Sequence, residues 1–267
     1  MAAPLYDAHA HFAAPALRQD WQQISNDLEK INLKYAVVNG TSPNDWPAVL
    51  ELAKSDPQMI PAIGMHPWQV NDAATDWQAQ FLRALDRGAR VIGEVGLDQW
   101  IEGHDLEQQQ LAFRWQLAQA TQRNLPVSIH CLKAIGPLME IVRSDTLPKR
   151  GFHLHAYNGP VELIPELVEL GAYFSFNAGQ LRTRKSKTPE RICAVPAERL
   201  LIETDAPDML PATGLRSFDL PNSVSGHALT HPATLIDGYT AIADLRATPI
   251  EFLRQQVASN FEHYFIS

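Results

Sequence analysis

The chain has 267 residues, which exceeds most single domains but matches the roughly 250 residues that one α/β barrel needs. Hydrophobic residues make up 45% and charged residues 19% of the chain, and this composition excludes a disordered or fibrous protein. The formal net charge of -8 argues against a broadly basic surface that coats nucleic acid, but a phosphate substrate stays open because bound metal ions can dominate the field of a site.

Short apolar runs alternate with segments of helical spacing along the chain. The runs predict eight buried parallel strands, at 5–12, 34–40, 59–67, 90–98, 125–131, 151–157, 172–178 and 199–207. Helices are predicted at 20–31, 44–55, 74–87, 105–124, 133–144, 160–170, 187–195, 233–245 and 249–265. Asp105 is the expected N-cap of the longest helix, and Pro249 the expected first residue of the last. The alternation predicts a (β/α)₈ TIM barrel that forms a single domain over residues 1–267.

Cellular location follows from what the sequence lacks. Cys131 and Cys193 are too few for a disulfide framework, which favours a reducing compartment. No run approaches the 18 or so apolar residues of a membrane span, and no secretory signal is expected because the first strand begins near residue 5. We expect a cytoplasmic protein with no membrane partner and no evident obligate protein partner.

Polar residues gather at the C-terminal ends of the predicted strands. This group contains six of the ten histidines and four acids: His9, His11, His66, His130, His153, His155, Glu94, Asp98, Glu203 and Asp205. In a (β/α)₈ barrel these strand ends form the mouth where active sites are built. Mixed nitrogen and oxygen donors suit Zn²⁺, Mn²⁺ or another first-row divalent ion better than Ca²⁺.

The N-terminal motif supports a metal site. Asp7, His9 and His11 occupy alternate positions of the first predicted strand, so all three are expected to project from one face. Burying two imidazoles and a carboxylate without partners is costly, and a cation removes that cost by making them ligands. The same argument applies to Glu94 in VIGEVGLD and to Asp205 in LLIETDAP.

Six motifs follow one another along nearly the whole chain: DAHAHF, GMHPW, IGEVGLD, LPVSIHC, HLHAYNG and LIETDAPDM. In this order they resemble the TatD family of metal-dependent deoxyribonucleases, within the amidohydrolase-like TIM barrels. The SKT segment at 186–188 and the ending ETDAPDM resemble the YjjV-like branch. The resemblance implies hydrolysis of DNA phosphodiester bonds, from an end of the strand, by a metal-activated water.

The resemblance also implies two divalent metal ions, which are Mg²⁺, Mn²⁺ or Zn²⁺, and six ligands. His9, His11 and Asp205 resemble the ligands of the first ion. His130 and His155 resemble those of the second, and Glu94 resembles the carboxylate that bridges the two.

Two of these assignments have alternatives. His66 resembles a residue that contacts the substrate phosphate, although a lone histidine at a strand end is as often a hydrogen-bonded rim residue. His153 and His155 share a strand face, so spacing alone allows either as a ligand. Counting back from the end of the HLHAYNG motif favours His155.

A mechanism follows as a hypothesis. Glu94 and Asp205 are the expected catalytic residues: Glu94 bridges the cations, and Asp205 accepts the proton of the attacking water. Asp7, Asp98 and Glu203 are expected to orient the ligating side chains, and for Asp98 and Glu203 a structural salt bridge is the alternative.

Cys131 follows His130 directly, which raises a cysteine–histidine nucleophile as another possibility. Adjacent residues of a strand point to opposite faces, so we expect the thiol to face away from the site.

The segment after the last strand departs from the family pattern. It reads HALTHPATL at 227–235, with Thr230 and His231 where the family commonly has Asn and Glu. Arg216 and Asn222 in the preceding loop are candidates to compensate. The change leaves metal binding untouched and puts the natural substrate in doubt.

Other groups near the mouth have ordinary and functional interpretations. Trp46, Trp68 and Trp100 are expected to pack over the helices, with stacking on bases as the alternative. The basic run at 182–187 either steers a polyanion or forms a solvated loop. The remaining histidines are expected on the surface, with a place near the mouth as the alternative for His231: His104, His227, His231 and His263.

Two other functions compete with a deoxyribonuclease. A hydrolase with the same metal core could act on a small phosphoester, amide or lactone, which would suit the acidic net charge and the altered 227–235 segment. A non-catalytic scaffold would also keep the barrel, but binding alone does not require a full set of metal ligands.

Overall fold

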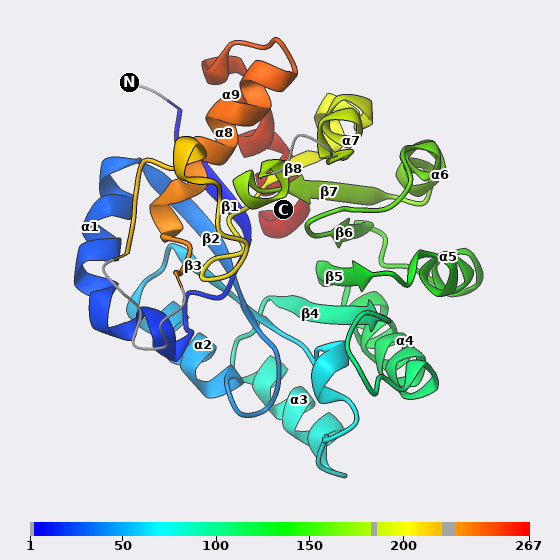
Figure 1. The fold of residues 1–267 in the computed structure, drawn as a ribbon. Coiled ribbons are helices and arrows are strands. Elements are labelled where there is room, and N and C mark those ends of the chain that lie inside the picture. Colours follow the sequence, from blue (N-terminus) through cyan, green and yellow to red (C-terminus); the bar gives the residue numbers. More distant parts are fainter. Residues whose placement is uncertain (1–2, 183–185, 221–227) are drawn as a thin grey trace.

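The computed structural model describes residues 3–182, 186–220 and 228–267. Strands lie in the middle of the molecule and helices surround them (Figure 1). The strands are β1 (Leu5–Ala10), β2 (Leu33–Gly40), β3 (Met59–Ile63), β4 (Val91–Asp98), β5 (Val127–Leu132), β6 (Phe152–Leu154), β7 (Ala172–Phe176) and β8 (Leu200–Ile202). Each overlaps one predicted run, and all but β2 are shorter than their run, mostly because its polar end belongs to a loop. β2 begins one residue before its run, and β5 ends one residue after its run.

The strands form one parallel sheet in chain order, from β1 to β8. Two backbone hydrogen bonds join the first strand to the segment after the last. The N–H of Asp205 donates to the carbonyl of His9 over 3.0 Å, and that of His11 donates to Ala206 over 2.8 Å. The predicted (β/α)₈ barrel is therefore confirmed as a nearly closed barrel, with its seam held together beside His9 and His11.

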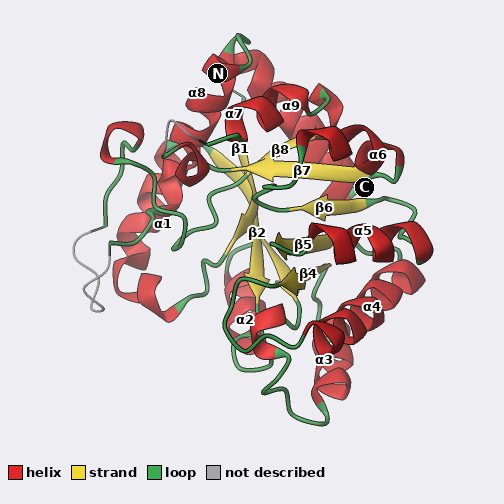
Figure 2. Ribbon diagram, turned by 45° about the vertical axis from the view of Figure 1, so that its right-hand side comes forward, coloured by secondary structure: helices red, strands yellow, loops and turns green. Residues whose placement is uncertain are grey.

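Helices cover the outside of the strands (Figure 2). They are α1 (Trp21–Lys30), α2 (Trp46–Ser55), α3 (Trp77–Asp86), α4 (Leu106–Arg123), α5 (Ile135–Ser144), α6 (Ile164–Glu169), α7 (Thr188–Ala194), α8 (Leu235–Leu245) and α9 (Ile250–Phe261). Asp105 caps α4 as predicted, since its carboxylate accepts from the N–H of Gln108. The prediction for Pro249 is wrong by one position: its ψ of 134° is extended, so it caps α9 instead of beginning it.

Two apolar clusters fill the barrel. The larger one lies between strands and helices, and the smaller one joins inward-facing strand residues to the C-terminal segment. Within the smaller cluster, the Tyr264 hydroxyl donates to the carbonyl of Val127, the first residue of β5, over 2.8 Å. The C-terminal segment thus closes the N-terminal end of the barrel and leaves the opposite end for a site. None of the described helices has the length and apolarity that crossing a bilayer requires.

Candidate metal centre

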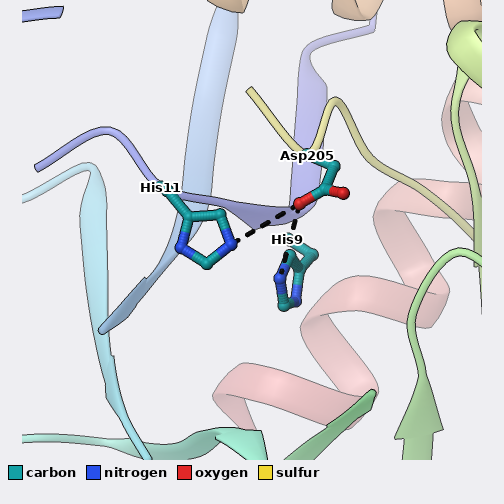
Figure 3. A group of neighbouring side chains, drawn as sticks. All are labelled: His9, His11 and Asp205. Atoms are coloured by element: carbon teal, nitrogen blue, oxygen red, sulfur yellow. Dashed lines mark ion pairs between the residues drawn. The ribbon is translucent and has the colours of Figure 1, made fainter. Parts of the chain in front are cut away.

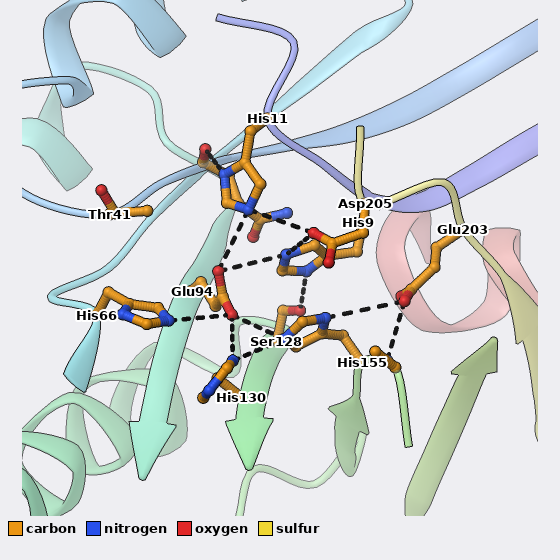
Figure 4. Close-up of polar contacts among 12 residues, drawn as sticks. His9, His11, Thr41, His66, Glu94, Ser128, His130, His155, Glu203 and Asp205 are labelled. Atoms are coloured by element: carbon orange, nitrogen blue, oxygen red, sulfur yellow. Dashed lines mark hydrogen bonds and ion pairs between the residues drawn. The ribbon is translucent and has the colours of Figure 1, made fainter. Parts of the chain in front are cut away.

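The carboxylate of Glu94 lies at the centre of five imidazoles at the C-terminal end of the strands (Figure 4). Its Oε2 faces β1, at 3.5 Å from His9 Nε2 and 3.3 Å from His11 Nε2. Its Oε1 faces the other side of the mouth, at 2.8 Å from His130 Nδ1 and 2.7 Å from His155 Nε2. The two oxygens of one side chain therefore divide the imidazoles into two groups.

Asp205 completes the group beside β1 (Figure 3). Its Oδ1 lies 3.8 Å from His9 Nε2 and 3.5 Å from His11 Nε2. The ligand atoms of these three residues lie within 4.8 Å of one another, as do those of two further groups, His9–Glu94–His155 and His66–Glu94–His130. The barrel thus brings together all six predicted ligands, from β1, β4 and β5 and from the segments that follow β1, β6 and β8.

Close approach of β4 and β5 places Glu94 against His130. Gly96 lies between Glu94 and Asp98 with φ of +140°, a conformation that favours glycine. A Cβ at this position would clash with the backbone of His130. A side chain at residue 96 would therefore push apart the two strands that carry the bridging carboxylate and one imidazole.

Hydrogen bonds fix the orientation of two imidazoles. The Nδ1–H of His11 donates to the carbonyl of Asn39 over 3.0 Å, which leaves Nε2 as the ring nitrogen that faces Glu94. The Nε2–H of His130 donates to Asp98 over 2.8 Å, which leaves Nδ1 facing Glu94. Such bonds select the tautomer that can bind a cation.

His9 is oriented by a buried chain of hydrogen bonds below the centre. The ionised Glu203 accepts from the Ser175 hydroxyl, so the oxygen of Ser175 accepts in turn from His153 Nε2–H over 2.6 Å. His153 Nδ1 then accepts from the Ser128 hydroxyl over 3.1 Å, and Ser128 accepts from His9 Nδ1–H over 2.9 Å. The order of donors leaves a lone pair on His9 Nε2 for the centre. The motifs did not reveal the parts of Ser128 and Ser175, because serines inside a strand carry no distinctive pattern.

His155, and not His153, lies beside Glu94. His153 binds the two serines one layer deeper, where burial holds its pKa well below the usual value. Of these two histidines, only His155 has a ring nitrogen facing the Glu94 carboxylate, which favours His155 as the candidate ligand. His155 also stacks on His9, with ring centroids 3.9 Å apart.

The protonation of the centre is dominated by Glu94. Burial opposes its ionisation, but the imidazoles of His66 and His155 outweigh burial and hold its pKa well below the usual value. Burial also lowers the pKa of His11, yet hydrogen bonds with Asp205 and Glu94 raise it well above normal. His11 therefore carries a proton that a cation would have to displace.

An orphaned atom shows that the donor set fits a cation. His9 Nε2 is fully buried, and the described residues give it no hydrogen-bond partner. It faces two carboxylates at more than 3.4 Å, too far for a hydrogen bond but suitable for a shared ion between them. A buried polar atom without a partner is costly, and a metal ion removes the cost. Neutral nitrogens with carboxylate oxygens suit a first-row divalent ion.

The expectation that Asp7 projects with His9 and His11 is wrong. The register of β1 shifts between Asp7 and Ala10, so the alternation of side chains is interrupted. Asp7 accepts from the Thr204 hydroxyl over 2.6 Å and from the N–H groups of Thr204 and His9. It thus holds the residue before Asp205 and contacts no imidazole of the centre.

The other two carboxylates expected to orient ligands lie beside imidazoles. Asp98 accepts from His130 Nε2–H, and Glu203 lies 3.8 Å from His155 Nδ1. Glu203 also accepts from the N–H of Ala156 over 3.0 Å, which holds the turn after β6.

His66 occupies the rim of the centre, with Nε2 3.4 Å from Glu94 Oε1. Its Nδ1 accepts from the N–H of Trp68 over 3.1 Å, so Nε2 carries the proton. A protonated Nε2 donates hydrogen bonds and offers no lone pair to a cation. The tautomer therefore favours contact with an anionic substrate oxygen over a ligand role.

A cavity of about 630 Å³ opens above the centre and is lined by His11, His66, Glu94, His130, His155 and Asp205, among others. Cys131 is absent from this lining and lies partly buried against the core under α5, where burial raises the pKa of its thiol to about 12. A thiol in that state is a poor nucleophile, in agreement with its expected orientation away from the site.

The segment 228–235 packs against α1 instead of lying on the surface. The surface expectation for His231 is wrong: it is 1% exposed, stacks on Phe218 and lies 3.4 Å from Asp27. Its partner is 204 residues away in the chain, so no local pattern could identify it. Arg216 pairs with Asp219 and is absent from the cavity lining, while Asn222 and His227 lie outside the described residues, as do Arg184 and Lys185 of the basic run.

Replacing His231 with Asn should weaken the pH dependence of stability. The Asn oxygen can still accept from Ala233 N–H, as His231 Nδ1 does over 3.0 Å. Burial lowers the pKa of His231 below 6.5 despite Asp27, so the unfolded chain binds more protons as the pH falls through 6.5. The wild-type free energy of unfolding therefore falls as the pH is lowered from 7.5 to 5.5. Over the same change, the free energy of unfolding of the variant should fall by up to about 1 kcal/mol less than that of the wild type.

Urea unfolding with chelator at the two pH values measures this difference. His104→Asn at an exposed position is the control and should keep the wild-type dependence. An unchanged dependence in His231→Asn would show that this ring does not titrate as described.

Comparison with known proteins places the chain among metal-dependent hydrolases of one family. The family model described as TatD related DNase matches residues 6–266. The chain is 28% identical, over 95% of its length and 95% of the relative, to the uncharacterized metal-dependent hydrolase YjjV of Escherichia coli (strain K12). It is 32% identical to the 3'-5' ssDNA/RNA exonuclease TatD of Edwardsiella piscicida, over 72% of this chain and 75% of that one.

Solved structures agree in fold. The crystal structure of Escherichia coli YjjV superposes with a TM-score of 0.89 at 25% identity and covers all of both chains. A TatD family hydrolase from Entamoeba histolytica superposes over the full length with a TM-score of 0.87, at 19% identity. The barrel thus has counterparts that extend over the full chain.

Proposed function

The chain belongs to the family of TatD-related DNases, and from this membership and the geometry of the centre we propose that it is a metal-dependent hydrolase that removes nucleotides from an end of single-stranded DNA. The observation that carries the proposal is the pair of Glu94 oxygens, which divides the imidazoles into two groups. A relative named as an exonuclease on single-stranded DNA and RNA supports the substrate class.

We assign His9, His11, Asp205 and Glu94 Oε2 to one ion, and His130, His155 and Glu94 Oε1 to the other. Divalent ions bound there would supply Lewis acidity, which lowers the pKa of a water and offsets charge on a phosphate. Glu94 and the imidazoles would hold the ions in fixed positions, because Asn39, Asp98 and Ser128 orient three of the rings through hydrogen bonds.

Asp205 would accept the proton of the attacking water. Burial raises the pKa of its carboxyl above the usual value, which makes the carboxylate a better base than an exposed one. His66 would donate its Nε2–H to a non-bridging oxygen of the phosphate. Water, base and donor would then surround the phosphorus within the same cavity.

A small phosphoester, amide or lactone is the second candidate substrate. The described residues that line the cavity include no lysine or arginine, so the wall has no fixed cation for a polyanion. A non-catalytic scaffold would leave the ordered ligand set without use. The cytoplasmic location and the single domain over residues 1–267 stay predictions.

Chelation should abolish cleavage of a single-stranded oligonucleotide, and added Mg²⁺ or Mn²⁺ should restore it. The expected loss exceeds about 1000-fold, because without the ions no group is present to lower the pKa of the water. The products, resolved by length over time, should shorten by single nucleotides from one end.

A panel of small phosphoesters, amides and lactones under the same conditions separates the candidates. An inert oligonucleotide beside rapid turnover of a small substrate would replace the nuclease proposal with the second candidate. Oligonucleotide cleavage that persists in chelator would exclude the metal mechanism.

A further inference from the structure

Two tryptophan side chains at the mouth are exposed although the centre beside them is buried. Trp68 is 44% and Trp100 59% exposed, whereas Trp46 is 2% exposed and donates to the carbonyl of Gly64. The expected packing over helices is therefore right for Trp46 and wrong for the other two. Trp68 and Trp100 both line the cavity that contains Glu94. Large aromatic surface exposed beside a buried polar site is available to a ligand.

One carboxylate ties both tryptophans to the metal centre. Asp98 Oδ2 accepts from Trp68 Nε1–H and from His130 Nε2–H, each over 2.8 Å. Asp98 Oδ1 accepts from the backbone N–H of Trp100 over 2.6 Å. The Trp68 ring stands edge-on to His66, with centroids 5.0 Å apart and an interplanar angle of 82°. The Trp68 indole is thus held in a fixed place next to His66, the imidazole that we propose donates to the substrate phosphate.

The charge of the cavity indicates what these rings contact. Its described lining contains four acids, Asp45, Glu94, Asp205 and Asp208, and no lysine or arginine. Ions in the centre can offset only the reacting phosphate, so the rest of a nucleic acid must be held by uncharged contacts. Stacking of a base on an indole is such a contact, and it tolerates any base because each has an aromatic face.

We propose that Trp68 and Trp100 form a stacking platform for the nucleobase next to the scissile phosphate. The inference rests on the proposed function and adds how a single-stranded end is held: its base is free to stack, whereas a base in a duplex is already paired and stacked. With few phosphate contacts, binding should depend only weakly on salt. The platform determines affinity and positioning, and the metal centre performs the hydrolysis.

The test compares oligonucleotides that keep the phosphate but lack the base. Two series of thymidine octamers carry a tetrahydrofuran abasic residue at the terminal or the penultimate position of the degraded end. At one of these two positions the missing base is the one that would stack on the tryptophans. For that abasic substrate, wild-type kcat/KM should be roughly 5- to 150-fold lower than for the intact octamer. Trp100→Ala should lose a similar factor on the intact octamer and leave that abasic substrate unaffected, while Trp100→Phe should restore part of the loss.

Matched variants separate stacking from structure. Trp68→Phe keeps a ring and removes the hydrogen bond with Asp98, so it should retain most of the preference for the base. Phe252→Ala removes an aromatic residue that is 58% exposed on α9 and absent from the cavity lining. It should leave kcat/KM unchanged on both the intact and the abasic octamers. Equal effects of Trp100→Ala on intact and abasic octamers would overturn the platform.

Fluorescence anisotropy with labelled intact and abasic octamers measures binding independently of turnover. Chelator-sensitive cleavage without any preference for the base would keep the proposed function and overturn the platform. Absence of cleavage, with binding that depends on the base and on Trp100, would overturn the nuclease proposal and support the platform. Absence of both would overturn both.

Discussion

Replacing Glu94 with Gln should reduce kcat by at least about 1000-fold and remove most of the bound metal. The amide has the same shape but no negative charge, and one of its two ends is an NH₂ group that cannot bind a cation. Both ion-binding groups share this side chain, with His11 3.3 Å from one oxygen and His155 2.7 Å from the other. Metal content by elemental analysis and the rate of oligonucleotide cleavage check the result on one preparation.

Glu166→Gln is the matched control, because Glu166 pairs with Arg143 on the exposed side of the helices. It should keep wild-type metal content and rate. Thermal unfolding in chelator shows whether Glu94→Gln still folds. A folded Glu94→Gln protein with full metal content and full rate would contradict the bridging role.

Replacing Asp205 with Asn should lower kcat by about 100- to 10,000-fold, because the amide cannot accept the proton of the water. The His130–His155 side should still bind metal, so metal content should fall by less than in Glu94→Gln. The wild-type rate should fall as the pH drops through the pKa of Asp205, which burial raises, since only the carboxylate is a base. The residual rate of the variant should lack this acidic limb.

Asp208→Asn provides the control for charge at the mouth. Asp208 is exposed and lines the same cavity but belongs to none of the possible metal groups. It should keep the acidic limb and change the rate by only a small factor. An Asp205→Asn protein with the wild-type pH profile would show that another group accepts the proton.

The fold and most of the candidate ligands are predictable because they follow from local pattern. Buried parallel strands are continuous apolar runs, so polar residues at their ends mark the mouth of the barrel. His9 and His11 stand out because alternation on one strand already places them together. The same pattern does not reveal the shift in the register of β1. For that reason it predicts, incorrectly, that Asp7 projects from the same face as these two histidines.

The remaining features depend on contacts between distant segments. His153 and His155 have the same local pattern, and only the serines on β5 and β7 decide which of them faces Glu94. Trp46 and Trp68 each follow a strand, yet their surroundings differ. Trp46 is buried and donates to the carbonyl of Gly64, whereas Trp68 is partly exposed and donates to Asp98. Sequence spacing gives the face of a strand but not the partner that a side chain finds across the barrel.

Anomalous diffraction from crystals grown with Mn²⁺ most directly tests whether the Glu94 carboxylate joins two cations. We predict two strong peaks at the mouth, one in contact with His9, His11 and Asp205 and the other with His130 and His155, each touching a different oxygen of Glu94. A map without peaks at Glu94, from protein that cleaves the oligonucleotide in Mn²⁺, would contradict the account.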